Sequence, residues 1–423
     1  MDGFLLRGLL GVALLTAMPL AAQQAVELPA RDESLEPEMT EVFQVGSFDG
    51  AAWETFGEVN QVAFDGDGNL YVMDRQNFRV VVVDGDGRFV RQFGTEGGGP
   101  GEWRIPAGMG VLADGTVVVA DGGHRAFMVY NAEGEFSHAV SMGEGATISL
   151  GALLADPLGG AVFSSAGGSF SVRMSAGSGA PELPTGRPIE RITVGSDGVK
   201  SVFYTAWQPP RQAPVPSSGG GVGTMVVSAG GPRTFEPRLH VAVLPDGGLA
   251  VVDSSAYAVR VVGPDGELDH LVRRAIDPVA VTKRIEEDEK QRQLDDIDTG
   301  EGPQMRIMVR GSDGSTRSMA QDQIQDLQRQ MLEQRGFYPE IPVVARLAAS
   351  PAGTIWLERA RVNPEEPGPI DLFRVDGTYL GTVSAEGLRI PAAFGPDGLV
   401  AYIETDQFDV PTVRVSRLPS AVR

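Results

Sequence analysis

Short apolar runs rich in Val, Ile, Tyr and Phe alternate along most of the chain with turns built on Gly, Asp and Asn. Runs of this kind, bounded by turn residues, predict β-strands rather than helices. Three stretches share one frame, in which a turn glycine precedes an Asp by six residues and a second turn glycine follows that Asp by thirteen. They are VAFDGDGNLYVMDRQNFRVVVVDGDGRFV, GVLADGTVVVADGGHRAFMVYNAEGEF and VAVLPDGGLAVVDSSAYAVRVVGPDGEL. Copies with the same two spacings indicate an internal repeat.

Each repeat reads as strand, tight turn, strand, loop, strand, tight turn, strand, which is the pattern of a propeller blade. Less regular copies begin near Leu150, Val343 and Ala392 and predict a third, fifth and sixth blade. We therefore expect an all-β fold, a six-bladed β-propeller of four-stranded antiparallel blades. The sixth copy lacks an outer strand, and the N-terminal residues 41–47 (EVFQVGS) are expected to supply it and close the ring.

The first repeat carries a family resemblance. Its stretch FDGDGNLYVMDRQNFRVVVVDGDGRFVRQFG resembles an NHL repeat, and the linker GGGPGEWRIP with the PDG turns is similar to bacterial exported six-bladed β-propeller proteins with NHL-like repeats. The resemblance is sharpest over residues 56–143 and 237–275, and it implies the same fold. Three positions depart from the repeat: His124 stands where it has Asn, and Ala256 and Ala258 stand where it has Asn and Arg.

The linker FGTEGGGPGEWRIP, residues 93–106, is rich in glycine but does not fit a phosphate-binding loop. A Walker-type loop needs Lys and then Ser or Thr after its last glycine, whereas Pro100 follows Gly99 here. The dinucleotide pattern of three spaced glycines fails as well, because Glu102 occupies the third position. We expect the segment to join the outer strand of blade one to the inner strand of blade two, with Trp103 packed between the two blades.

The N-terminus predicts export. Residues 1–22 combine Arg7 with an apolar stretch that ends in small residues, which is typical of a secretory signal peptide cleaved near Ala22. An uncleaved membrane anchor is the alternative. The mature chain, without a membrane span, is expected to be periplasmic or extracellular. Because it has no cysteine, neither disulfides nor zinc thiolates are possible.

After the signal peptide, residues 23–40 are expected to be a linker and residues 41–423 the propeller. A Gly- and Pro-rich insertion at 203–236 follows blade three, and a helical insertion at 278–341 lies between blades four and five. In an antiparallel blade, turns after the first and third strands share one face, and loops after the second and fourth share the other. The tight Asp-Gly turns define the first, the turn face. All long insertions fall on the second, the elaborated face, where loops on a rigid scaffold tend to carry function.

The larger insertion contains two predicted helices. SMAQDQIQDLQRQMLEQRG begins with Ser318 and Gln321 in capping-box spacing and places Ile324, Leu327 and Met331 on one apolar stripe. TKRIEEDEKQRQLDD before it predicts a charged helix with little apolar content. The pair is either a solvated flap packed on the rim or a lid over an axial pocket.

One residue per blade ends the second strand, six positions after the first turn glycine, and these residues are expected to form a ring on the elaborated face. The ring consists of Asp74, Asp121, Ser165, Asp253, Arg359 and Glu404. Its four carboxylates are candidates for holding a cation such as Ca²⁺. The alternative, which needs no cofactor, is that each Asp accepts backbone N–H bonds in its own turn.

Composition and motifs narrow the function. The net charge of −21 argues against a nucleic-acid partner, because phosphates are neutralised by Lys and Arg. Propeller enzymes to which the chain bears a distant resemblance, the gluconolactonases and peptide-amidating lyases, hold a divalent ion on the axis. No histidines stand in H-x-x-x-H or H-x-H spacing here, so the sequence provides no positive sign of catalysis.

We therefore expect a non-catalytic propeller of the cell envelope or secretome that binds a peptide, a glycan or a protein partner on the elaborated face. The candidate contacts are Trp103, Arg104, Trp207 and Arg359, together with the four ring carboxylates. A metal-dependent lyase or lactonase is the alternative from another class, and a structural component of the envelope is a third.

Overall fold

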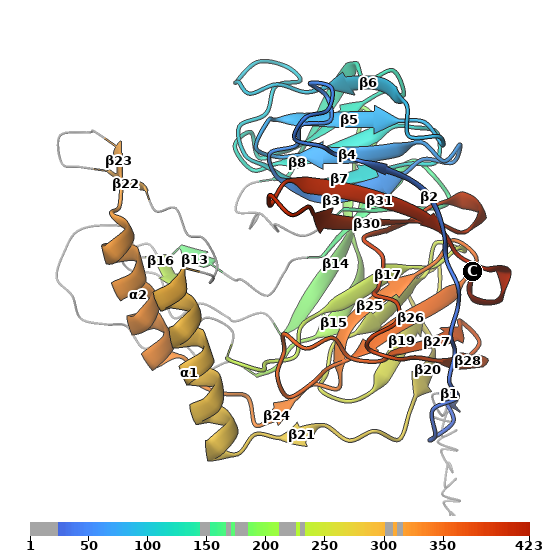
Figure 1. Cartoon of the computed structure of the whole chain (residues 1–423), viewed down its shortest axis with the longest axis vertical. Coiled ribbons are helices and arrows are strands. Elements are labelled where there is room, and N and C mark those ends of the chain that lie inside the picture. The colour runs from blue at the N-terminus through green and yellow to red at the C-terminus, as the bar shows by residue number, and fades with distance from the viewer. Residues whose placement is uncertain are drawn as a thin grey trace, which may run out of the picture.

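The chain folds into a six-bladed β-propeller of antiparallel four-stranded blades (Figure 1). The computed structural model describes residues 24–143, 153–165, 171–173, 185–210, 226–228, 233–300, 308–310 and 316–423. The predicted signal peptide, residues 1–22, lies outside these stretches, as does most of the predicted Gly- and Pro-rich insertion.

The first three blades follow one another along the chain. Blade one contains β3 (Val59–Phe64), β4 (Leu70–Asp74), β5 (Arg79–Val83) and β6 (Phe89–Phe93). Blade two contains β7 (Pro106–Val111), β8 (Val117–Asp121), β9 (Ala126–Tyr130) and β10 (Phe136–Ser141). Blade three contains β11 (Leu154–Ala155), β12 (Ala161–Ser165), β14 (Gly186–Thr193) and β15 (Lys200–Trp207). Because β15 extends to Trp207, the predicted insertion at 203–236 begins later than its sequence indicated.

The other three blades complete the ring. Blade four contains β17 (His240–Val243), β18 (Leu249–Val252), β19 (Ala258–Val262) and β20 (Leu268–Arg273). Blade five contains β25 (Val344–Ala349), β26 (Thr354–Arg359), β27 (Ile370–Arg374) and β28 (Tyr379–Val383). Blade six contains β29 (Ala393–Phe394), β30 (Leu399–Thr405), β31 (Pro411–Arg417) and, from the N-terminus, β2 (Thr40–Val45).

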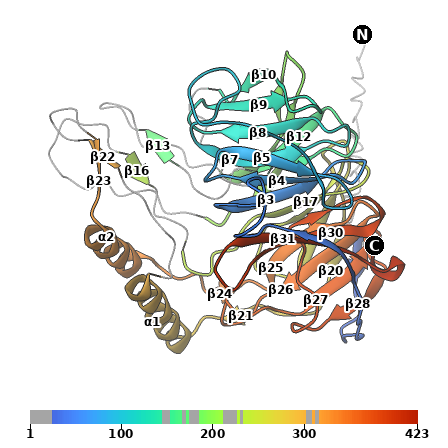
Figure 2. The same ribbon diagram turned by 45° about the horizontal axis from the view of Figure 1, so that its top comes forward.

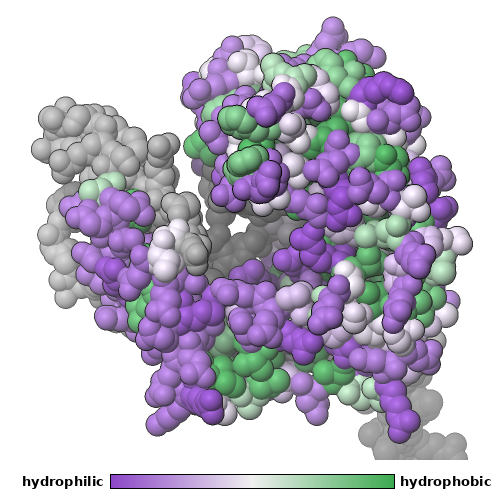
Figure 3. Space-filling model, viewed as in Figure 1, coloured by the Kyte–Doolittle hydropathy of each residue, from purple (hydrophilic) through white to green (hydrophobic). Residues whose placement is uncertain are grey.

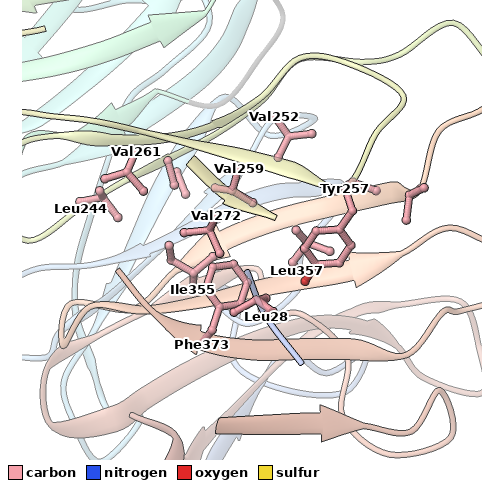
Figure 4. Packing of buried hydrophobic residues seen from close by; sticks show 14 residues of the cluster. Leu28, Leu244, Val252, Tyr257, Val259, Val261, Val272, Ile355, Leu357 and Phe373 are labelled. Carbon is pink, nitrogen blue, oxygen red and sulfur yellow. The ribbon is translucent and has the colours of Figure 1, made fainter. Parts of the chain in front are cut away.

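Apolar surface shared between neighbouring blades holds the disc together. The buried residues form six clusters, and each cluster combines residues of two adjacent blades. Between blades four and five, Val259 packs in the same cluster as Phe373 (Figure 4). Between blades six and one, Val413 shares a cluster with Val81, so the ring is closed by packing as well as by strand pairing. Each such side chain contributes roughly 1.5–3 kcal/mol when fully buried.

The tight turns on the turn face depend on glycine. Gly68 and Gly115 have φ angles of +84° and +81°, a left-handed conformation that strains other residues. In the first of these turns the carboxylate of Asp65 accepts the backbone N–H groups of Asp67 and Asn69 at 3.0 and 2.9 Å. Local bonds of this kind keep the turns short, which leaves the turn face without long loops.

The N-terminal segment closes the ring in the predicted way. β2 pairs antiparallel with β31, and Val45 lies opposite Val413. This confirms that the N-terminal strand supplies the outer strand of blade six. A propeller closed by strands from both ends of the chain leaves no unpaired edge at its junction.

The residues before β2 are not the linker that the sequence predicted. β1 (Gln24–Glu27) adds in parallel to the outer edge of β20 in blade four. Leu28 is buried in the cluster between blades four and five, and Leu35 donates its N–H to the carbonyl of Thr382 in blade five. Residues 24–39, which we call the strap, therefore run along the outside of the disc from blade four to blade six (Figure 1).

The helical insertion stands beside the disc. α1 (Lys283–Thr299) and α2 (Gln321–Gln334) pack together and connect to the blades through a short ladder of β21 (Val279–Ala280) and β24 (Glu340–Ile341). Two small ladders, of β13 (Ser171–Arg173) with β16 (Val226–Ser228) and of β22 (Met308–Arg310) with β23 (Thr316–Ser318), lie near the helices (Figures 1 and 2). None of the helices in the described stretches is long and apolar enough to cross a membrane.

The predicted details of α2 need correction. Ser318 lies in β23, so the N-cap is Ala320 and no side chain caps the helix. The buried residues are Ile324 and Leu332, whereas Met331 is 45% exposed. The face that packs on α1 thus follows an i, i+4, i+8 row rather than the predicted stripe, because α1 approaches from that side.

Candidate functional site

The elaborated face is organised by the Asp residues that end the second strands. In blade two, Asp121 is fully buried and accepts the N–H groups of Arg104 and Ile105 at 2.8 and 2.9 Å. It also accepts the N–H of Gly123 at 2.7 Å and Nδ1–H of His124 at 2.9 Å. Burial raises the pKa of Asp121, but these donors together hold it below its usual value. The carboxylate thereby fixes the segment that enters the blade against the end of its second strand.

Blade one repeats this arrangement, whereas in blade four Asp253 holds the end of β15, the outer strand of blade three, and its Oδ1 has no hydrogen-bond partner among the described residues. Asp74 accepts the N–H groups of Gly57 and Glu58 at 3.1 and 3.2 Å, and Asp253 accepts the N–H of Trp207 at 2.8 Å. The side chain of Asn77 donates to Asp74 at 2.7 Å, which is the role that His124 performs towards Asp121. The departure of His124 from the repeat therefore conserves a hydrogen bond.

The contacts of the ring residues bear on the two roles predicted for them. Asp74 and Asp121 are fully buried and accept hydrogen bonds at both carboxylate oxygens, whereas Asp253, which is 1% exposed, accepts them at Oδ2 only. Glu404 is bound by Arg414 and Arg389 at 2.7 Å, and the bonds from Arg414 and Arg389 keep its pKa low. The described residues contain no group of three or more His, Asp or Glu side chains able to hold a metal ion.

Two predicted contacts are used inside the protein. Trp103 is fully buried between blades one and two and donates Nε1–H to the hydroxyl of Tyr130 at 2.6 Å. Its ring meets that of Tyr130 edge-on at 6.0 Å between centroids. Trp103 therefore packs between the blades as the linker pattern predicts, and it presents no surface to a ligand, contrary to its predicted role as a contact.

Arg359 anchors the strap. Its guanidinium is 2.7 Å from the carboxylate of Asp32, and its side chain is only 16% exposed. The same carboxylate lies 2.7 Å from Arg274, which also pairs with the fully buried Asp371 at 2.7 Å. Arg359 thus belongs to a network that joins the strap to blades four and five, and this network explains its position without a ligand.

Arg104 and Trp207 remain available on the surface. Asp121 holds the backbone of Arg104, while the Arg104 side chain is exposed and has no ion-pair partner among the described residues. Trp207 ends β15 and is 39% exposed. Its backbone is fixed on both sides, because Asp253 accepts its N–H and Arg187 donates to its carbonyl at 2.9 Å.

Two neighbours of these residues were not predicted. Ile105, beside Arg104, is 56% exposed, and Arg238 is exposed just before β17. Buried Arg187 donates to the carbonyls of Trp207, Pro237 and Asp253 at 2.9, 2.9 and 2.7 Å, and so holds Trp207 next to Arg238. The repeat pattern could have indicated them, because Ile105 and Arg238 both stand just before the inner strand of a repeat.

Two arginines lie close to the ring of His240. His240 begins β17, and burial, with added repulsion from Arg238 and Arg187, lowers its pKa to about 4. We call the exposed residues Arg104, Ile105, Trp207 and Arg238 the arginine patch. Arg104, Ile105 and Arg238 precede the inner strands β7 and β17, and Trp207 ends β15, the outer strand of blade three.

A half-open hollow of about 280 Å³ lies elsewhere, on the turn face between blades five and six. Its lining includes Ser350, Phe394, Asp397, Leu399 and Arg423. The chemistry of the ring and the arginine patch is therefore not located in this hollow.

Comparison with known proteins agrees with the fold. Residues 54–142 match the family DUF5128, described as a 6-bladed beta-propeller. The matched segment comprises blades one and two, which contain the sharpest repeats. No curated protein matches the chain in sequence.

Solved structures extend the likeness to the whole disc. A member of the DUF4221 family from Bacteroides vulgatus is 10% identical, with a TM-score of 0.51 and coverage of 92% of this chain and 99% of its own. A candidate exported protein from Bacteroides fragilis is 10% identical, with a TM-score of 0.47 and coverage of 94% and 99%. A gluconolactonase from Xanthomonas campestris is 14% identical, with a TM-score of 0.35 and coverage of 92% and 98%. At such identities the likeness extends to the fold alone.

Proposed function

We propose that the protein is an exported, non-catalytic binding propeller with NHL-like repeats, and that it holds a segment of a partner protein on its elaborated face. The observation that carries the proposal is the arginine patch: Trp207, Ile105 and Arg104 are exposed on this face, while the ring carboxylates are buried or paired. Tryptophan and arginine are enriched among the residues that dominate binding energy at protein interfaces. Because buried carboxylates fix the backbone at these residues, the backbone has little conformational entropy left to lose on binding.

The rival enzymatic function has less support. A metal-dependent lyase or lactonase would need the ring carboxylates as ligands of an axial ion. In blade two the oxygens of Asp121 already receive four hydrogen bonds, and Glu404 is shared by two arginines. The hydrogen-bond donors of Asp121 and the arginines of Glu404 would have to be displaced before either carboxylate could bind a cation.

Site-specific photo-crosslinking in living cells tests the proposal. A benzophenone amino acid at Trp207 is expected to give one discrete adduct, whereas the same group at Leu158, which is 66% exposed on the turn face, gives none. Fractionation of the same cells is expected to locate the protein outside the cytoplasm with an N-terminus near Gln23. Absence of an adduct at Trp207, or the same adduct at both positions, would contradict binding on the elaborated face and favour a structural role. Recovery in the cytoplasm would contradict export.

A further inference from the structure

The positive charge of the arginine patch is not balanced by ion pairs within the described part of the protein. The chain carries a net charge of −21, and several arginines of the elaborated face have carboxylate partners, such as Arg75 with Glu58 and Arg389 with Glu404, although Arg361 in the middle loop of blade five has none in the described stretches. Arg104 and Arg238 are exposed without a carboxylate partner in the stretches that the structure describes. An unpaired guanidinium beside an exposed apolar side chain is suited to bind a carboxylate that carries an apolar neighbour.

The patch is held in place by buried groups. Arg104 and Ile105 follow one another directly before β7, and their N–H groups are both fixed by Asp121. On the other side, Arg187 ties the carbonyls of Trp207 and Pro237 together, so the backbone of Trp207 stays close to that of Arg238. The pair Arg104 and Ile105 and the pair Trp207 and Arg238 therefore belong to different blades of the same propeller.

We infer that the arginine patch takes an acidic polypeptide segment that also carries aromatic or aliphatic side chains. This inference rests on the proposed function and specifies the chemistry of the partner. Carboxylates of the segment pair with Arg104 and Arg238, and its apolar side chains cover Ile105 and Trp207. Because the two arginines precede inner strands of blades two and four, several consecutive residues are needed to reach both.

The helical pair of the same chain is an acidic element whose connection to the blades passes close to the patch, where Phe337 pairs with Thr234 four residues before Arg238, but the helices themselves are held by other contacts. α1 is tied to the middle loop of blade five by a bond between Arg292 and Glu365, and α2 donates from Gln325 to the carbonyl of Ile297 at 3.1 Å. Figure 3 shows the pair as a largely hydrophilic lobe standing apart from the upper blades of the disc. An external segment is therefore the better occupant of the patch.

Binding of synthetic polymers to the full chain tests the inference. The probes are a random copolymer of glutamate and tyrosine, poly-glutamate, and polygalacturonate as an anionic polysaccharide. We expect the copolymer to bind at least about tenfold more tightly than either anionic control, because only it supplies both charge and apolar surface. Affinity is expected to fall with added salt as ion pairs are screened.

Variants locate the binding. Arg104→Glu combined with Arg238→Glu is expected to weaken copolymer binding by at least about tenfold, whereas Arg88→Glu on the turn face leaves it unchanged. The folded state of each variant is checked by its thermal transition. Nuclear magnetic resonance of the four histidine rings gives a second readout, since the signal of His240 should move on binding and that of His138, on outer strand β10, should not.

Three outcomes overturn the inference: equal binding of polygalacturonate, undiminished binding by the double variant, or a His240 signal that does not respond. If crosslinking at Trp207 captures a partner while the copolymer fails to bind, the proposed function stands and only the acidic chemistry is wrong. If both experiments fail, the elaborated face is not the binding surface.

Discussion

The environment of His240 leads to a prediction about stability and pH. His240 lies at the start of β17, where its ring is surrounded by protein and close to Arg238 and Arg187. Burial, with added repulsion from these arginines, lowers its pKa from 6.5 to about 4. The perturbation is His240→Gln, which keeps a polar side chain of similar reach but cannot take up a proton.

The direction in which stability changes with pH follows from which state, folded or unfolded, protonates His240 at the higher pH. As the pH falls below about 6.5, the unfolded chain protonates this histidine while the folded chain does not, so folding loses stability until the folded pKa near 4 is reached. At about 1.4 kcal/mol for each pH unit, the full loss is about 3 kcal/mol. Above about pH 7 the imidazole is neutral in both states and the effect vanishes.

Urea unfolding of the wild type and the variant, followed at several pH values from about 7 down to about 4, measures this difference. The free energy of unfolding of the wild type should fall by about 3 kcal/mol more than that of His240→Gln over this range. Carboxylates titrate equally in both proteins and cancel. His138→Gln, on an outer strand far from Arg187 and Arg238, is the matched control. A difference that stays constant with pH would refute the reasoning, because the ring would then not be held uncharged.

Two further predictions concern buried charge. Arg274→Met removes the closer cation of the fully buried Asp371 and leaves only Arg359 at 3.6 Å, so it is expected to lower the free energy of unfolding by about 3 kcal/mol, whereas Arg274→Met with Asp371→Leu recovers most of it in the same urea titration; an equally unstable double variant contradicts this. Asp121→Ala removes the acceptor of three backbone N–H groups and should cost about 3 kcal/mol, seen as a lower Tm, while Asp114→Ala in an exposed turn changes little. Equal shifts in Tm would contradict the role of Asp121 in fixing the entering segment.

The fold could be predicted from the sequence because it depends on the local spacing of turn residues. The six-residue interval from Gly68 to Asp74 records a tight turn and one strand, both of which depend on neighbouring residues only. The closure by β2 was also predictable, because the last repeat visibly lacks a strand. The family match to residues 54–142 covers the part where these local signals are clearest.

Contacts between residues far apart in the sequence could not be predicted. Asp32 is ordered by Arg274 and Arg359, which are 242 and 327 positions away, and no local pattern marks it. The role of Trp103 depends on how close two blades lie, so a tryptophan at this position suited packing between the blades and contact with a ligand equally well. Two of the three backbone donors to Asp121 lie 16 and 17 residues upstream, and only the third, Gly123, belongs to its own turn, so the local pattern did not reveal the other two.

The strap and β2 have a consequence for the order of folding. These residues are synthesised before the blades, yet their partners follow much later in the chain, in β20 (Leu268–Arg273), β28 (Tyr379–Val383) and β31 (Pro411–Arg417). Blades one to three can condense as the chain emerges, whereas blade six and the outer edge of blade four must wait for the remaining sequence. Contacts of such high sequence separation are slow to form. The last kinetic step is therefore expected to be the docking of the N-terminal segment, and until then the disc remains an open arc with unpaired strand edges.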